Sequence, residues 1–145
     1  MVAKLTSIIA TIVLVAAVVD LAVRKGLIGS GPISISLQIA AILLVLWARL
    51  TFGFRSLHFA AKPTRGPLII SGPYRYVRNP IYAAAWLFVW AGIAVHWSSA
   101  NALLGLVAAA TLVVKIICEE KLLREAYVEY DDYARRTPRL IPFLF

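Results

Sequence analysis

The chain alternates between long apolar stretches and short polar segments. Four stretches consist almost entirely of apolar residues, at positions 5–23, 33–50, 80–97 and 100–118. Each is close to the ~20 residues that a helix needs to cross the hydrocarbon core of a bilayer. This pattern predicts an all-α integral membrane protein with four transmembrane helices. We expect one domain over residues 1–145, with a connecting segment at 51–79 and a helical tail at 119–145.

The composition agrees with a membrane environment. Hydrophobic residues make up 61% of the chain and the mean hydropathy is +0.83, well above the values of an ordinary soluble domain. The first stretch has an alternative interpretation as a cleaved signal peptide, because Lys4 precedes it and small residues follow. Its apolar run is longer than a usual signal-peptide core, so we expect a membrane span.

The distribution of charge predicts an orientation. The segment between the second and third stretches contains no acidic residue but five basic ones, Arg55, Lys62, Arg65, Arg75 and Arg78. The positive-inside rule places this side in the cytoplasm, and an even number of spans puts both termini there as well. We expect a protein of a bacterial or archaeal inner membrane, with this connecting segment and both termini at the cytoplasmic face. Arg24 and Lys25 on the other side are the exception.

The charge and the metal-ligand residues also exclude some classes of function. The net charge is +8, but the basic residues flank the apolar stretches, so membrane lipid headgroups are a better partner than nucleic acid. Cys118 is the single cysteine, which excludes an internal disulfide. The two histidines, His58 and His96, are expected on opposite sides of the membrane, and no metal site is predicted.

The segment SGPYRYVRNPIY, residues 71–82, concentrates polar, aromatic and cationic side chains between two apolar stretches. Arg75 and Arg78 can bind carboxylates or phosphates, and Pro73 and Pro80 restrict the path of the chain into the next helix. A simpler interpretation stays open: the arginines could only anchor the helix to headgroups, and the tyrosines could only form an interfacial belt.

Near the C-terminus, Lys115 lies inside the fourth stretch, one helical turn before Glu119. Four residues of helix separate them by only ~6 Å along the axis, so they share a face. An ionisable residue within a span indicates a functional site, although the lysine could instead reach the membrane surface. Glu120 points about 100° away from Glu119, where Arg124 can neutralise it. We expect this helix to continue to residue 136 or 137, ahead of a proline.

The order of these motifs resembles the family of integral-membrane methyltransferases typified by isoprenylcysteine carboxyl methyltransferase, with relatives that methylate phosphatidylethanolamine. The likeness covers residues 66–145 and rests on SGPYRYVRNPIYAA from Ser71, EEKLL from Glu119 and RLIPF from Arg139. The resemblance implies an enzyme that transfers a methyl group from S-adenosyl-L-methionine to a lipophilic acceptor at the membrane interface.

The resemblance also implies which residues form the site. Lys115 matches a family arginine that contacts the substrate, and Arg78 and Glu120 match charged motif positions to which we assign supporting roles. Asn79 stands where the family usually has histidine, and Lys115 cannot bind a carboxylate in the bidentate manner of arginine. The implied cofactor-binding residues are Leu68, Ile69, Tyr74, Asn79, Pro80, Ile81, Tyr82 and Glu119.

Three functions remain open at this point. The leading expectation is O-methylation of the carboxylate of a prenylated or lipid-linked substrate, because a carboxylate is ionised at neutral pH and needs no general base. The alternative is N-methylation of a phospholipid or small amine, which must first lose a proton. A non-catalytic membrane protein that keeps the fold is a third possibility, with Asn79 as the mark of lost activity.

Overall fold

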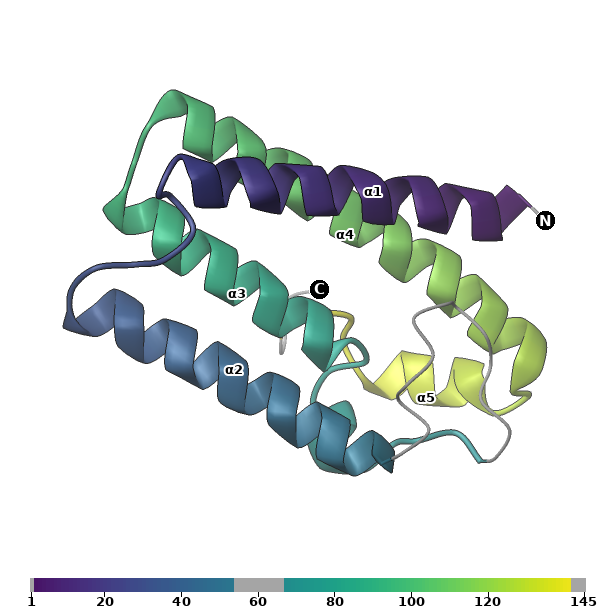
Figure 1. The fold of residues 1–145 in the computed structure, drawn as a ribbon. Helices are drawn as coiled ribbons and strands as arrows, with labels where there is room; N and C mark the ends of the chain where they lie inside the picture. The colour runs from purple at the N-terminus through teal and green to yellow at the C-terminus, as the bar shows by residue number, and fades with distance from the viewer. Residues whose placement is uncertain (1, 54–66, 142–145) are drawn as a thin grey trace.

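The computed structural model describes residues 2–53 and 67–141, and within these residues all regular structure is helical. Figure 1 shows the elements in chain order. They are α1 (Val2–Val23), α2 (Pro32–Phe52), the 3-10 helix η2 (Gly72–Arg75), α3 (Pro80–Val95), α4 (Ser99–Ala126) and α5 (Tyr130–Arg136). The prediction of an all-α membrane protein is confirmed.

Three of these helices, α1, α2 and α4, are long and apolar enough to cross a membrane. The helix α3 is just as apolar but has only 16 residues, fewer than the ~20 that a spanning helix needs. The count of four spans therefore stays a prediction. The helix α4 has 28 residues, so it is ~42 Å long and continues well beyond the predicted stretch at 100–118.

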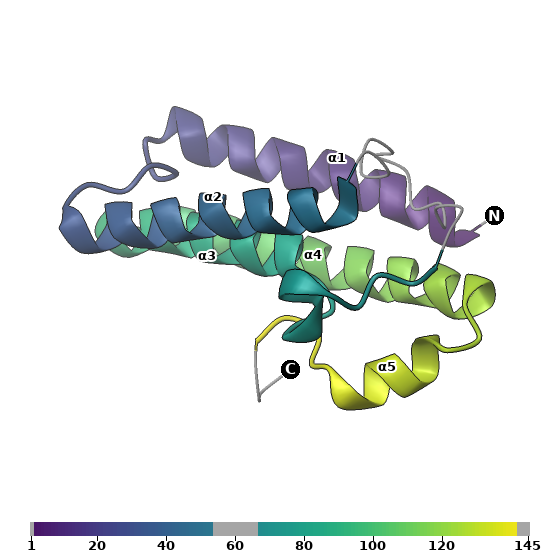
Figure 2. The same cartoon turned by 90° about the horizontal axis from the view of Figure 1, so that it is seen from below.

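The helices do not pack in the order of the chain. The helix α1 packs mainly against α4, α2 packs mainly against α3, and the two pairs join where α3 contacts α4. Figures 1 and 2 show this arrangement from two directions, with α1 along α4 and α2 along α3. The first and last long helices of the chain are thus neighbours, and this pairing decides which side chains can meet in the site.

Buried polar groups hold α2 and α3 to the loop that precedes α2. Gln38 accepts a hydrogen bond from the Gly29 amide (3.0 Å) and donates to the carbonyl oxygens of Leu27 (2.8 Å) and Phe88 (3.1 Å). The loop also crosses α3 closely at Gly92, where a Cβ atom would lie 2.2 Å from the Leu27 carbonyl oxygen. A single buried amide side chain therefore satisfies backbone groups from two segments, as the low-polarity interior requires.

The C-terminal tail corrects one expectation. The last helix ends at Arg136, as predicted. The prediction of one continuous helix up to that residue is wrong, because α4 ends at Ala126 and α5 begins at Tyr130. Tyr127 adopts an extended conformation (φ −128°, ψ 115°) that interrupts the helix. The break lets α5 turn back beneath α4, as Figure 2 shows, and buries Tyr130, which is only 2% exposed. Burial of this aromatic ring stabilises the turned-back position of α5.

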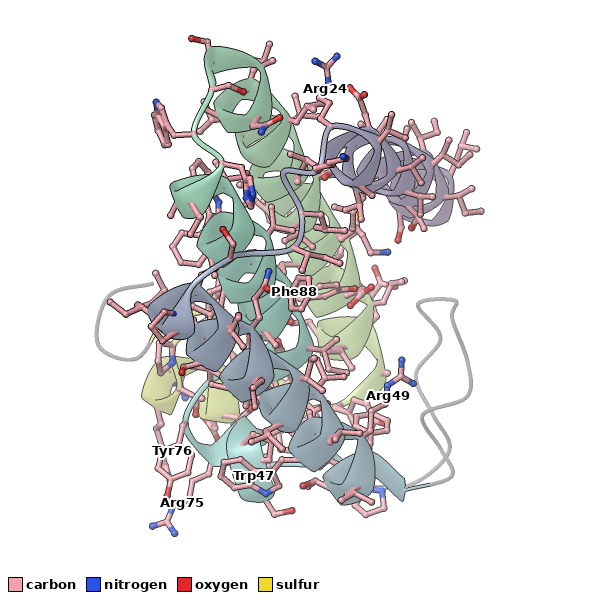
Figure 3. The ribbon with its side chains drawn as sticks, turned by 60° about the vertical axis from the view of Figure 1, so that its left-hand side comes forward. Arg24, Trp47, Arg49, Arg75, Tyr76 and Phe88 are labelled. Atoms are coloured by element: carbon pink, nitrogen blue, oxygen red, sulfur yellow. The ribbon has the colours of Figure 1, made fainter. Side chains whose placement is uncertain are left out.

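The connections divide between the two ends of the bundle. The start of α1, the end of α2 and α5 lie at one end, whereas the α1–α2 and α3–α4 connections lie at the other (Figure 1). In Figure 3, Arg49 and Arg75 mark the first end together with Trp47 and Tyr76, and Arg24 marks the opposite end. Cations and amphipathic aromatic rings at one end are the pattern expected of a membrane–water interface, and its cytoplasmic orientation stays a prediction.

This arrangement leads to a labelling prediction. In a Cys118→Ser background, Ser99→Cys should react with a membrane-impermeant maleimide on intact cells, because Ser99 is exposed at the α3–α4 end. Arg136→Cys, at the opposite end, should react only after the cells are permeabilised. Labelling of Arg136→Cys on intact cells would place the predicted site outside the cytoplasm.

Candidate active site

The segment that leads into α3 is shaped by glycine and proline. Gly72 has a φ of +57°, which favours glycine, and a Cβ atom there would lie 2.4 Å from the Thr51 hydroxyl. Pro80 occupies the first turn of α3, where a missing amide hydrogen is tolerated. The aromatic rings of Tyr74 and Phe52 lie 5.7 Å apart and fasten η2 to the end of α2.

The closing motif of the chain binds the residues just before α3. The Arg78 amide donates to the carbonyl oxygen of Pro138 (2.8 Å), and the Asn79 amide donates to that of Arg139 (3.1 Å). The Asn79 side chain donates to the same Arg139 oxygen at 3.2 Å. These contacts join two segments that are 60 positions apart in the chain, so Pro138 and Arg139 serve to position the residues at the start of α3.

Glu120 lies at the centre of a buried ionic cluster. Its side chain is 1% exposed, and one oxygen lies 3.2 Å from Arg78 Nη1 and 3.4 Å from Asn79 Nδ2. Its other oxygen lies 3.2 Å from Arg139 Nε and 3.8 Å from Arg124 Nη2. The predicted contact with Arg124 therefore exists but is the longest of the three ion pairs. Glu120 is a structural centre that joins α4 to both flanking segments.

Tyr130 lies beside this cluster and Tyr74 lies near Glu119, and both phenols keep their protons. Burial, reinforced by the charge of Glu120, raises the pKa of Tyr130, and the Arg124 guanidinium lies 5.6 Å from the centre of its ring. Burial raises the pKa of Tyr74 to about 12, opposed by Arg49 and reinforced by Glu119. The Tyr74 phenol is therefore neutral at physiological pH and can donate a hydrogen bond.

A second polar group joins three helices next to the first. The Tyr82 hydroxyl donates to Glu119 Oε1 at 2.5 Å, and Lys115 Nζ lies 3.7 Å from the same oxygen. Lys115 also donates to Thr11 Oγ1 (2.9 Å) and lies 3.4 Å from Ser7 Oγ on α1. The lysine side chain is only 10% exposed, so it is covered by the protein itself. It is held within the seam between α1 and α4.

The structure places the predicted site residues in one region. Tyr82, Glu119 and Lys115 form one group, and Arg78, Asn79 and Glu120 form the adjoining cluster. The remaining residues of the predicted cofactor shell lie in η2, in the segment before it and at the start of α3: Tyr74 and Pro80 are buried, and Leu68, Ile69 and Ile81 are half-buried. Their contact with a cofactor stays a prediction.

Sequence reasoning missed the contribution of α1. Ser7 and Thr11 are one helical turn apart in an apolar stretch, and that spacing was the available signal for a polar stripe. Nothing in the sequence indicated that the stripe faces Lys115, about a hundred positions away. No group of three or more metal-ligating side chains is close enough to hold a metal ion in the described ranges 2–53 and 67–141.

Comparison with known proteins gives the same family as the motifs. The family described as phospholipid methyltransferase matches residues 30–130. The nickel-cobalt-cadmium resistance protein NccN of Alcaligenes xylosoxydans xylosoxydans is 36% identical over 78 residues, which are 53% of this chain and 37% of that protein. The cobalt-zinc-cadmium resistance protein CzcN of Cupriavidus metallidurans is 35% identical over 78 residues, 53% of this chain and 36% of that protein. The matched region thus spans little more than a third of either relative, and no solved structure matches.

Proposed function

Because the chain belongs to the phospholipid methyltransferase family, a family of integral-membrane methyltransferases, we propose that it transfers a methyl group from S-adenosylmethionine to a lipophilic acceptor at the cytoplasmic membrane interface. The observation that carries this proposal is the group formed by Tyr82, Glu119 and Lys115 where α3 and α4 meet. It combines an anion, a cation and a hydroxyl inside an apolar helical body.

The residues present fit the proposed cofactor. The Glu119 side chain is 26% exposed, so its carboxylate can be reached and can accept charge-assisted hydrogen bonds from an ammonium group. Tyr74 adds a neutral phenol, and the half-buried Leu68 and Ile69 supply apolar surface. When bound, the cofactor supplies a methyl group that its sulfonium already activates, so the protein needs mainly to orient the reactants and exclude water.

The acceptor that this site suits best is a carboxylate on a prenylated or other lipid-linked molecule. The Lys115 ammonium lies in the seam beside Glu119 and can attract an anionic group. As the carboxylate oxygen forms its bond to the methyl carbon, the carbon–sulfur bond breaks and the electron pair stays on sulfur. No proton has to be removed, so the absence of a histidine at position 79 is compatible with this chemistry.

The description of the family favours a second candidate, N-methylation of a phospholipid headgroup. An amine acceptor must lose a proton before or during transfer. Glu119 would be the group to accept it, since its carboxylate is partly exposed beside Tyr82. The two candidates share the cofactor and differ in the acceptor atom.

One experiment tests the proposal and separates the candidates. The purified protein is incubated with methyl-tritiated S-adenosylmethionine and a lipid extract of its host membrane in mixed micelles. We expect labelled lipid whose label is released as methanol by mild base, the behaviour of a methyl ester. Base-stable label would assign N-methylation instead. If the wild-type protein neither binds the cofactor nor labels any lipid, the proposed function is wrong and a non-catalytic role takes its place.

A further inference from the structure

The environment of Lys115 is built largely by a helix outside the family match. The match begins at residue 30, whereas α1 ends at Val23. Two of the three polar partners of the Lys115 ammonium, Thr11 Oγ1 and Ser7 Oγ, belong to α1, and the third is Glu119. An ammonium group has three hydrogens to donate. Only the two α1 hydroxyls lie within hydrogen-bond distance, at 2.9 and 3.4 Å, whereas the Glu119 oxygen is 3.7 Å away, so one hydrogen is left for an incoming anionic group.

The hydroxyl of Thr11 is oriented for this contact. It donates its single hydrogen to the Ser7 carbonyl oxygen at 2.8 Å. Its lone pairs are therefore the part available to Lys115 Nζ, 2.9 Å away. The neighbouring Thr111 on α4 behaves differently, because its hydroxyl contacts the carbonyl oxygens of its own helix, Val107 (3.0 Å) and Ala108 (2.8 Å).

The contact also has a consequence for the position of the charge. A lysine stem has four flexible carbons, and a lysine near the end of a span tends to extend toward the headgroups. Lys115 is buried and remains within ion-pair distance of Glu119. The α1 hydroxyls, together with the Glu119 carboxylate, offset the cost of burying an ammonium group here.

We propose that Thr11, assisted by Ser7, is a positioning residue that holds the Lys115 ammonium in place to receive the anionic part of the methyl acceptor. The helix α1 thereby completes the acceptor side of the site, while the matched region supplies the cofactor side. The role assigned to the acceptor rests on the proposed function. The position of the Lys115 ammonium is independent of the proposed function and can be measured separately.

The first test observes the ammonium itself. Protein labelled with ¹⁵N-lysine in detergent micelles should give one slowly exchanging NH₃⁺ signal that is absent in Lys115→Met. Thr11→Val should accelerate its hydrogen exchange by about tenfold or more, the effect of losing a hydrogen bond to a charged group. Thr11→Ser should restore the slow exchange, and the matched control Thr111→Val should leave it unchanged. The inference would be overturned if the Lys115 signal exchanged as slowly in Thr11→Val as in wild type. It would also be overturned if Thr111→Val accelerated the exchange as much as Thr11→Val.

The second test measures the two sides of the site separately. Transfer from tritiated S-adenosylmethionine is followed at increasing mole fractions of host lipid extract, and cofactor affinity is measured by calorimetry. Thr11→Val should raise the apparent KM for lipid by about tenfold and leave the Kd for cofactor within about twofold. If Thr11→Val weakened cofactor binding as much as it raised the apparent KM for lipid, the substitution would have damaged the whole site, and the positioning role would be overturned. If the wild type binds no cofactor, the proposed function fails, and the lysine signal still decides whether Thr11 positions Lys115.

Discussion

Replacing Glu120 by glutamine is expected to lower the free energy of unfolding by about 3 to 5 kcal/mol, the usual cost of breaking a buried ion pair from one side. The substitution keeps the shape of the side chain and removes its charge. Arg78, whose side chain is only 9% exposed, would then lack the carboxylate that lies 3.2 Å from its Nη1 atom. Its Nε atom has no hydrogen-bond partner among the described residues, and the neighbouring Tyr130 phenol is neutral, so it cannot balance the charge of Arg78.

Part of the effect should come from the closing segment. Glu120 also lies 3.2 Å from Arg139, the residue whose carbonyl oxygen binds both the amide and the side chain of Asn79. Loss of the carboxylate therefore weakens the connection between α4 and the start of α3. Arg139 and Arg124 are 33% and 41% exposed, so water can screen their charges and Arg78 should dominate the loss.

The measurement is an unfolding titration in mixed micelles with increasing dodecyl sulfate, followed by circular dichroism. Glu125→Gln is the matched control, because it makes the same chemical change on an exposed face of the same helix. We expect that control to remain within about 0.5 kcal/mol of wild type. A loss below about 1 kcal/mol for Glu120→Gln would show that the buried cluster contributes little net stability.

The second large effect is expected on cofactor affinity. Glu119→Gln should weaken binding of S-adenosylmethionine by about 1.5 to 3 kcal/mol, or roughly 10- to 150-fold in Kd, because a charge-assisted hydrogen bond to the ammonium of the cofactor is lost. Glu119 is 26% exposed and α4 places it between Tyr82 and Lys115. Stability should change less than in Glu120→Gln, since Lys115 keeps its contacts to α1.

Calorimetric titration in detergent measures this effect directly. Glu125→Gln again serves as the control and should bind the cofactor as tightly as wild type. On the fraction of Glu120→Gln that remains folded, we expect a loss of less than about 1 kcal/mol, because the Glu120 oxygens are already occupied by arginines. A greater loss of affinity for folded Glu120→Gln than for Glu119→Gln would reverse the roles of the two carboxylates.

Local features of the sequence were enough to predict the environment, the helices and the region of the site. Long apolar runs require a bilayer and a helix because the backbone must satisfy its own hydrogen bonds there. Residues four positions apart in a helix share a face, so the sequence also predicted that Lys115 and Glu119 are neighbours. The structure confirms their contact at 3.7 Å. The motif from Ser71 to Tyr82 indicated the family, which the match over residues 30–130 confirms.

Contacts between distant segments were decided only by the tertiary structure. The packing of α1 against α4 brings Thr11 to Lys115, the break after Ala126 turns α5 back, and the Arg139 carbonyl reaches Asn79. Each of these contacts depends on which apolar faces pack together. The hydropathy of a helix face does not identify the helix that packs against it, because the apolar faces are similar. Periodicity specifies a helix and its faces, because those are set by neighbours within a few residues. The identity of the facing helix is set by side-chain packing across the whole chain.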